Sequence, residues 1–286
     1  MSYKIITDTC CDFPADMYAD LGLEVVPLAV QFRGAYYDRY TEDWLKELFN
    51  GLRHGEATST SAVNPERWRQ RIASVLEQGM DALVLAFSSG LSATYQSAVI
   101  AADELQAEYP ERKIRVVDTL AASLGQGLLV YYACQKRDEG LSLDELAAWC
   151  EENRYHLCHW FTVDDLMYLK RGGRVSAATA LLGTMLQIKP VLHVDDEGHL
   201  TNVAKSRGRK ASIEALTKKV GELGAGYDTS TVFISHGDCL EDAQHLADLL
   251  KEKYGVKEVH IGYVGAVIGS HAGPGTLALF FLGEHR

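Results

Sequence analysis

The sequence is short of basic residues. It has 28 lysines and arginines against 39 aspartates and glutamates, which gives a formal net charge of −11 and an isoelectric point near 5.4. A protein whose main partner is a nucleic-acid backbone or an anionic membrane normally presents a cationic face. The deficit of basic residues therefore argues against nucleic acid as a partner and against a permanent membrane role. It is compatible with a local basic patch and with a transient membrane contact.

Export and metal-binding patterns are also missing. The opening MSYKIITDT lacks the basic start and long apolar core of a secretory signal, which favours a cytoplasmic protein. The six cysteines show no CxxC spacing, which argues against a disulfide framework or a zinc site. The uncharged stretch 264–282 contains His271, Pro274 and several glycines, so we interpret it as buried loop and strand rather than as a membrane span.

Signatures of nucleotide binding are absent as well. No GxxxxGK run followed by serine or threonine occurs, which leaves ATP binding by a P-loop unsupported. The run GPGTLA at 273–278 imitates a dinucleotide fingerprint, but it lacks a surrounding βαβ unit and a later acidic residue. The sequence therefore predicts no cofactor and no metal.

Short apolar runs alternate with helical patterns, as is typical of α/β proteins. In the first half KIIT, LEVVPLAV, ALVLAF and IRVV predict strands, with helices near 41–53, 65–78, 91–106 and 120–138. In the second half helices are predicted near 176–185, 209–223 and 240–253, and two strands flank only the turn DDEG, which predicts an antiparallel hairpin. We expect two domains: residues 1–156 as an N-terminal, Rossmann-like α/β domain with a parallel sheet, and residues 157–286 as a C-terminal α/β domain with a mixed sheet.

Hydroxyl side chains crowd the expected loops of the first half. They are Thr7, Thr9, Thr58, Ser59, Thr60, Ser61, Ser88, Ser89, Ser92, Thr94, Thr119 and Ser123. A nucleophile needs one hydroxyl and a base, whereas a carboxylate kept from water needs several neutral donors. With the apolar run SAATALLGTMLQI and the glycine-lined GAVIGSHAGPG, this pattern predicts an apolar slot with a hydroxyl-lined mouth, which would suit a fatty acid.

The main alternative is a serine hydrolase that acts on a lipid ester. The segment 90–94, GLSAT, follows an apolar strand and opens a helix as a nucleophile elbow does, with Ser92 as the nucleophile. Its last position is Thr94 rather than glycine, and a strand-end serine is more often a helix N-cap. Candidates to complete a triad are Asp8, Asp118, Asp238, His236 and His271.

Several motifs occur in an order that resembles the DegV family, which includes the fatty-acid-binding subunits of bacterial fatty acid kinase. They are the TDT start, SSGLSATYQSA, DTLAASLGQGLL, YLKRGGRVS and GAVIGSHAGPG. The resemblance runs from about Lys4 to Phe281. It implies a non-catalytic carrier that buries one long-chain fatty acid at the interface of two domains. It also implies that a partner kinase converts the presented carboxyl group to an acyl phosphate for phospholipid synthesis.

The resemblance also implies which residues hold the ligand and the partner. The family's carboxylate-binding threonine, serine and histidine match Thr60, Ser92 and His271. An extra TS pair in the loop TSTSAVNPERW leaves Thr58 as a competitor of Thr60. The candidate ligand-binding residues are Thr58, Ser59, Thr60, Ser61, Ser92, Ser270 and His271.

Two basic clusters are candidates for the kinase-binding surface. Arg207, in the segment KSRG, matches the arginine that serves the kinase in that family. Lys170, Arg171 and Arg174 form a second cluster, from which Arg171 is the second candidate. Capping of a helix end or ion pairing explains such residues equally well.

Overall fold

The computed structural model describes residues 2–176 and 188–286. The strands are β1 (Tyr3–Asp8), β2 (Glu24–Val26), β3 (Ala29–Phe32), β4 (Ala35–Tyr37), β5 (Thr58–Ser61), β6 (Asp81–Ala86), β7 (Ile114–Asp118), β8 (Leu157–Thr162), β9 (Ile188–Val194), β10 (Leu200–Arg207), β11 (Thr231–His236), β12 (Glu258–Tyr263) and β13 (Leu277–Leu282). The helices are α1 (Ala15–Asp20), α2 (Glu42–Arg53), α3 (Pro65–Leu76), α4 (Thr94–Glu108), α5 (Leu124–Asp138), α6 (Leu143–Asn153), α7 (Met167–Arg171), α9 (Arg209–Leu223), α10 (Leu240–Tyr254) and α11 (Ala266–Ala272), with short 3-10 turns η1 (Thr9–Cys11) and η2 (Arg154–His156).

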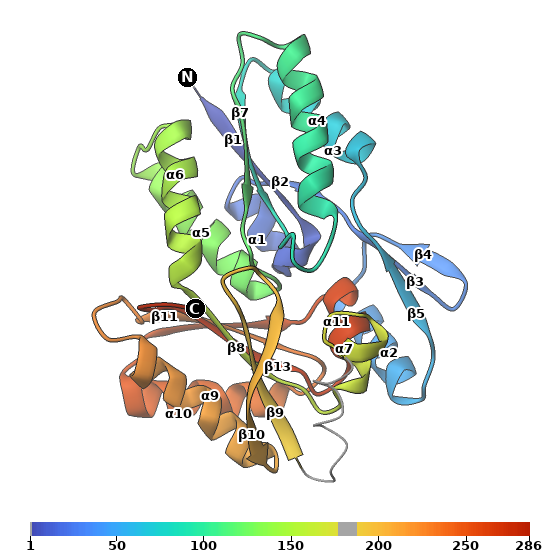
Figure 1. Cartoon of the computed structure of the whole chain (residues 1–286), viewed down its shortest axis with the longest axis vertical. Coiled ribbons are helices and arrows are strands. Elements are labelled where there is room, and N and C mark those ends of the chain that lie inside the picture. Colours follow the sequence, from blue (N-terminus) through green and yellow to red (C-terminus); the bar gives the residue numbers. More distant parts are fainter. Residues whose placement is uncertain (1, 177–187) are drawn as a thin grey trace.

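A parallel sheet of order β2-β1-β6-β7 forms the upper half of the molecule in Figure 1. Successive residues of its central strands alternate between two cores, because side chains along a strand point to opposite faces. Ile6 and Val84 pack with α3 and α4, whereas Ile5 and Leu83 pack with α5 and α6. A parallel sheet covered by helices on both faces confirms the α/β class predicted from the sequence.

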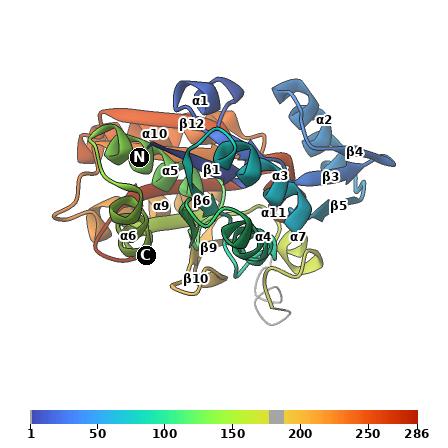
Figure 2. The ribbon, with the colours of Figure 1, turned by 90° about the horizontal axis from the view of Figure 1, so that it is seen from above.

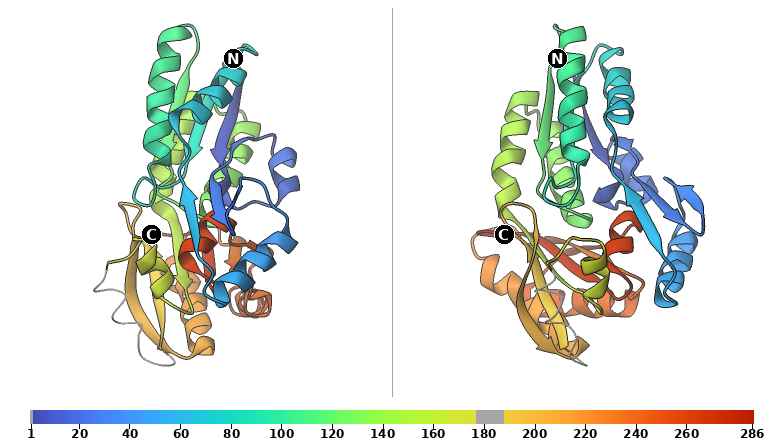
Figure 3. Two further views of the ribbon diagram at one scale, coloured as in Figure 1. Left: turned by 90° about the vertical axis from the view of Figure 1, so that its right-hand side faces the viewer. Right: turned by 45° about the vertical axis from the view of Figure 1, so that its right-hand side comes forward.

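A mixed sheet of order β10-β9-β8-β13-β11-β12 forms the lower half (Figure 3). The turn DDEG joins β9 and β10 in an antiparallel hairpin, as the sequence predicted. Helices α9 and α10 pack on one face of this sheet. The other face carries Phe161, Phe233, Ala278 and Phe280, which share a core with α5 of the upper half. The two halves therefore meet across this second face.

A third sheet, of order β4-β3-β5, was not expected. The run LEVVPLAV predicted a single strand, but it divides around Pro27 into β2 and β3, which belong to different sheets. Proline cannot donate a backbone hydrogen bond, so it interrupts a ladder. Residues 58–61, expected in a loop, form β5 and pair with β3. Figure 2 shows this small sheet and α2 projecting to one side of the rest.

The sequence analysis also failed to predict several helices. α1 and α6 were not predicted, and residues 266–272, expected as loop, form α11. A Cβ on Gly269 of α11 would lie 2.8 Å from the ring of Phe49 in α2, so the glycine permits the close approach of these helices. The helix predicted near 176–185 falls almost wholly outside the described residues. Within residues 2–176 and 188–286, no helix has the length and apolar character needed to cross a bilayer.

Candidate functional site

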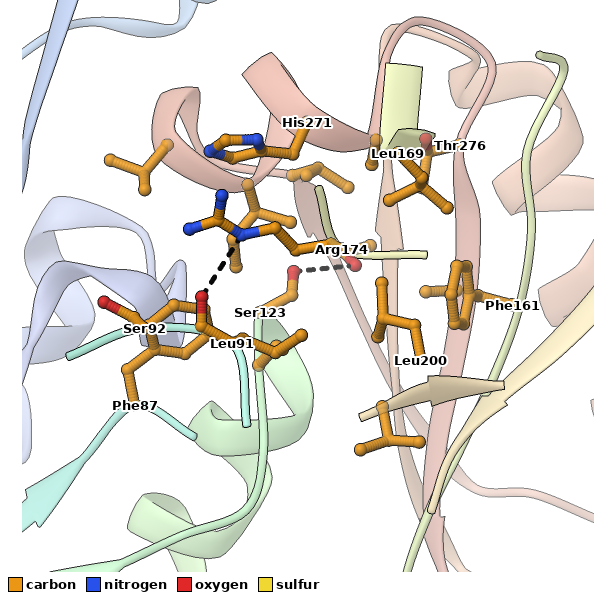
Figure 4. Close-up of a pocket in the computed structure, with 18 of the residues that line it drawn as sticks. Phe87, Leu91, Ser92, Ser123, Phe161, Leu169, Arg174, Leu200, His271 and Thr276 are labelled. Carbon is orange, nitrogen blue, oxygen red and sulfur yellow. Dashed lines mark hydrogen bonds between the residues drawn. The ribbon is translucent and has the colours of Figure 1, made fainter. Parts of the chain in front are cut away.

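A cavity lies among the mixed sheet, α11, β5 and the loops that follow β6 and β7 (Figure 4). It contains about 790 Å³ of space that no atom fills, part of it open to solvent. Its apolar lining consists of Leu28, Phe87, Leu91, Ala122, Phe161, Leu169, Val194, Leu200, Val264, Val267, Ile268, Ala272, Ala278 and Phe280. The wall is thus mostly hydrocarbon, with a few polar side chains set into it.

Thr60 and His271 meet at this cavity although 211 positions separate them in the chain. The Oγ1 of Thr60 lies 2.7 Å from Nε2 of His271, within hydrogen-bond distance. Thr60 belongs to β5, and pairing with Val30 of β3 fixes its register. His271 belongs to α11, which packs against β5. The small sheet and the short helix, both unforeseen, are the elements that bring these two residues together.

His271 is uncharged at neutral pH. Burial lowers its pKa to about 4, and the positive charge of Arg174 lowers it further in the same direction. A neutral imidazole carries one N–H donor and one acceptor nitrogen. It can therefore donate to a carboxylate, or accept from a protonated acid, without adding a charge of its own.

Ser92 lines the same cavity and is tied to the start of α4. Its Oγ accepts the backbone N–H of Thr94 at 3.2 Å and lies 2.8 Å from the Thr94 hydroxyl. This local bonding fixes the serine in the turn that precedes the helix. The N-cap of α4 is Ala93, which makes no side-chain cap hydrogen bond, so the capping role expected for Ser92 is not found. Its hydroxyl partner is Thr94, and no described histidine or carboxylate bonds it. Among the described residues, the hydrolase alternative therefore has no base that is hydrogen-bonded to Ser92.

Arg174 is a site residue that the sequence analysis missed. We had grouped it with Lys170 and Arg171, and nothing in the local spacing separates the three. Its guanidinium lines the cavity beside the ring of His271 (Figure 4), and its Nε donates to the carbonyl of Leu91 at 3.2 Å. It also donates to the carbonyl of Gly172. Among the described residues no carboxylate forms an ion pair with it, so a cationic group faces an apolar cavity without a counter-charge.

The remaining candidates divide into those that line the cavity and those that do not. Ser61 lines it beside Thr60. Thr58 and Ser59 are not lining residues, and the Ser59 hydroxyl donates to Gln31 instead. Ser270 is not a lining residue either, since its hydroxyl donates to the carbonyl of Ala266 in its own helix.

The two arginines proposed for the kinase surface are exposed. The guanidinium of Arg171 stacks 4.5 Å from the ring centre of Tyr168. Arg207 ends β10 opposite Ile188 of β9. Both side chains are accessible to a partner, and neither lines the cavity.

Two further hydroxyl residues, Ser123 and Ser235, line the cavity. The Oγ of Ser123 donates to Asp12 at 2.6 Å and lies 3.0 Å from Oγ of Ser235. Ser123 stands just before α5, and its φ of 55° is unusual for a residue other than glycine. The hydrogen bonds to Asp12 and Ser235 hold this conformation and link the two halves of the fold.

The fold and the cavity define a class: α/β proteins that enclose an apolar ligand space between a parallel and a mixed sheet. A family model described as DegV, a family of uncharacterised proteins, matches residues 2–284. A DegV domain-containing protein of Clostridium perfringens is 47% identical over 286 residues, which cover 99% of this chain and 98% of the relative. The chain therefore belongs to the DegV family.

Solved structures with the same fold include proteins described as binding fatty acids. A DegV family protein of Thermus thermophilus, described by its fatty acid binding, has a TM-score of 0.88 at 35% identity, with 99% of this chain and 100% of that chain covered. DegV of Bacillus subtilis, described as a fatty acid binding protein, has a TM-score of 0.83 at 27% identity, with 99% and 100% covered. Members of this family thus bind fatty acids.

Proposed function

We propose that this protein binds one long-chain fatty acid in the cavity and presents its carboxyl group to a partner fatty acid kinase, which forms the acyl phosphate used in phospholipid synthesis. The observation that carries the binding step is the position of Arg174. A guanidinium without an ionic partner faces an otherwise apolar cavity beside Thr60, Ser92 and His271. A fatty acid supplies both the missing anion and the hydrocarbon that the cavity wall requires.

The head group would lie among these donors. Arg174 carries the positive charge, Thr60 and Ser92 supply hydroxyls, and neutral His271 can donate one N–H. Hydrogen bonds to charged groups contribute more than neutral ones. The carboxylate therefore sets the direction in which the chain enters, and Ser61, which also lines the cavity, adds a further hydroxyl.

The hydrocarbon tail would supply most of the affinity. Each buried methylene contributes about 0.8 kcal/mol, so about fifteen of them provide roughly 12 kcal/mol before the costs of ordering the chain. Phe161, Leu169 and Phe280 are among the side chains available to pack against it. A protein of this kind needs no catalytic group of its own, because the kinase supplies ATP and metal.

The kinase would contact an exposed basic surface. Arg207 and Arg171 are accessible and stand outside the cavity. Arginine suits contacts with acidic side chains or phosphate, since its fork of donors binds such groups in pairs. Their exposure permits this role, and variants separate it from ligand binding.

Mass spectrometry of lipid extracted from protein purified under native conditions tests the binding step. We expect one fatty acid per chain, and the absence of any bound acid after incubation with palmitate or oleate would refute the proposal.

Arg207→Ala tests the partner step with the purified kinase and ATP. It should retain the acid but lose acyl-phosphate formation, while Lys210→Ala, an exposed neighbour, should behave as the unmodified protein.

A further inference from the structure

Thr94 is a fully buried residue that contacts two of the segments carrying the head-group donors. It begins α4 and does not itself line the cavity. Its Oγ1 lies 2.8 Å from Oγ of Ser92 and accepts the backbone N–H of Val63 at 3.4 Å. Val63 follows β5, the strand that carries Thr60. The side chain of Thr94 therefore joins the loop of Ser92 to the segment that carries Thr60.

The position of the Thr94 hydroxyl hydrogen follows from these neighbours. A hydroxyl donates one hydrogen bond and can accept two. The N–H of Val63 is a donor, so it uses one of the accepting positions of Thr94. Among the described residues, the oxygen of Ser92 is the one acceptor bonded to the Thr94 hydroxyl. Since Thr94 is shielded from water, its hydrogen would have no partner in any other direction, and an unsatisfied buried donor destabilises a fold. Thr94 therefore donates to Ser92.

This direction makes Ser92 a donor in its turn. Its oxygen accepts the hydroxyl of Thr94 and, at 3.2 Å, the backbone N–H of the same residue. Both of its accepting positions are then filled, and no other described group accepts its hydrogen. Ser92 is half-buried and lines the cavity, so a ligand in the cavity can accept that hydrogen. An ionised carboxyl group is an acceptor with no hydrogen of its own to donate.

The backbone of Thr94 is also held from outside the cavity. Its carbonyl accepts the Nε1–H of Trp68 at 3.1 Å. Trp68 is completely buried in α3, which packs against α4. Neither Trp68 nor Val63 lines the cavity. Two contacts that a ligand does not touch therefore fix the position from which Thr94 bonds Ser92.

We propose that Thr94 is a positioning residue that orients the hydroxyl of Ser92 as a hydrogen-bond donor toward the carboxylate of the bound acid. This inference rests on the proposed fatty acid binding and identifies how the site favours an ionised head group. A serine hydroxyl without this contact could either donate or accept, so it would suit an alcohol as well as a carboxylate. With Thr94 in place, Ser92 offers only its hydrogen.

Thr94→Val removes the hydroxyl while it keeps the size of the side chain and the backbone N–H. The affinity for palmitate should fall about three- to ten-fold. The affinity for hexadecanol should fall less, because the released serine can accept from an alcohol. Thr94→Ser keeps the hydroxyl and should bind palmitate within about two-fold of the unmodified protein.

Thr217→Val is the matched control. Thr217 is equally buried, its hydroxyl donates to the carbonyl of Ile213 within α9, and it does not line the cavity. This variant loses a buried hydrogen bond as Thr94→Val does, so it should be less stable and yet bind palmitate as the unmodified protein does. All affinities are measured at a temperature at which circular dichroism shows the variants to be folded. Thr94→Ala, which also lacks the hydroxyl, takes the place of Thr94→Val if the valine variant does not fold.

A double-mutant cycle with Ser92→Ala separates positioning from packing. On the Ser92→Ala background, Thr94→Val should cause no further loss of affinity, because the hydroxyl that it orients is gone. The inference is overturned if the two losses add, if Thr94→Ser binds as weakly as Thr94→Val, or if palmitate and hexadecanol weaken equally. Failure of the unmodified protein to bind palmitate would instead refute the proposed function.

Discussion

His271 occupies the space that a side chain at Gly172 would fill. A Cβ on Gly172 would lie 2.2 Å from Nδ1 of His271 and 3.1 Å from its Cγ. The glycine after α7 therefore permits the imidazole to reach Thr60. Two features therefore position the imidazole of His271: the lack of a side chain at Gly172 and the hydroxyl of Thr60 on β5.

Gly172→Ala should displace the imidazole and weaken fatty acid binding. The backbone at this position has a φ of −70°, which alanine adopts readily, so the main effect is the clash with His271. We expect a loss of about three- to ten-fold in affinity, measured by displacement of a fluorescent fatty acid. Ser270→Ala, whose hydroxyl bonds within α11, is the control and should bind as the unmodified protein does. Equal affinity of Gly172→Ala and the unmodified protein would show that His271 does not hold the acid.

Thr60 and Thr58 provide a matched pair on one strand. Both belong to β5, two residues apart, but only Thr60 lines the cavity and bonds His271. Thr60→Val keeps the shape and removes the hydroxyl, so affinity for palmitate should fall about three- to ten-fold. Thr58→Val should leave it unchanged. Titration calorimetry of both variants decides between the two threonines, and the reverse order would assign the site to Thr58.

The sequence predicted the sheets better than the site. Strands such as ALVLAF are continuous apolar runs of the kind buried in parallel sheets, and the turn DDEG leaves room only for a hairpin. These signals are local. Residues 58–61 form a strand of four hydroxyl residues, TSTS, whose pairing with β3 depends on a distant segment. No local periodicity identifies such a strand.

The candidate site was also predicted only where a local motif marked its residues. Thr60, Ser92 and His271 came from a resemblance in motifs, and the structure brings all three to one cavity. Arg174 carried no comparable signal, because its importance arises from a position at the cavity without an ionic partner among the described residues. Whether a charged group lacks an ionic partner depends on the packed structure, so composition and spacing could not identify this residue.

Arg174→Gln should separate the role of charge from that of shape. Glutamine retains hydrogen-bond donors but cannot neutralise a carboxylate. We expect the affinity for palmitate to fall about ten- to hundred-fold, since a hydrogen bond to a charged group is lost. The affinity for hexadecanol, which has the same chain length and no charge, should change much less. If acid and alcohol weaken equally, Arg174 acts through packing and not through its charge.

Asp12→Asn should make the protein less sensitive to alkaline pH. Burial raises the pKa of Asp12 to about 7, although the hydroxyl of Ser123 and the backbone N–H of Gly265 both donate to it. A carboxyl group whose pKa is raised on folding favours the folded state while it is protonated. Its contribution is complete below the model value of 3.8 and is lost as the pH rises toward 7.

Asparagine cannot ionise and can bond both Ser123 and Gly265, and it tolerates the left-handed backbone found at this position, where φ is 53°. Urea denaturation should therefore show Asp12→Asn to be more stable than the unmodified protein at pH 8, by on the order of 1–3 kcal/mol, with little difference at pH 4. Asp20→Asn, an exposed change at the end of α1, should show no such pH-dependent gain. A variant that is less stable at pH 8 would mean that the charged hydrogen bond to Ser123 outweighs the cost of burying the carboxylate.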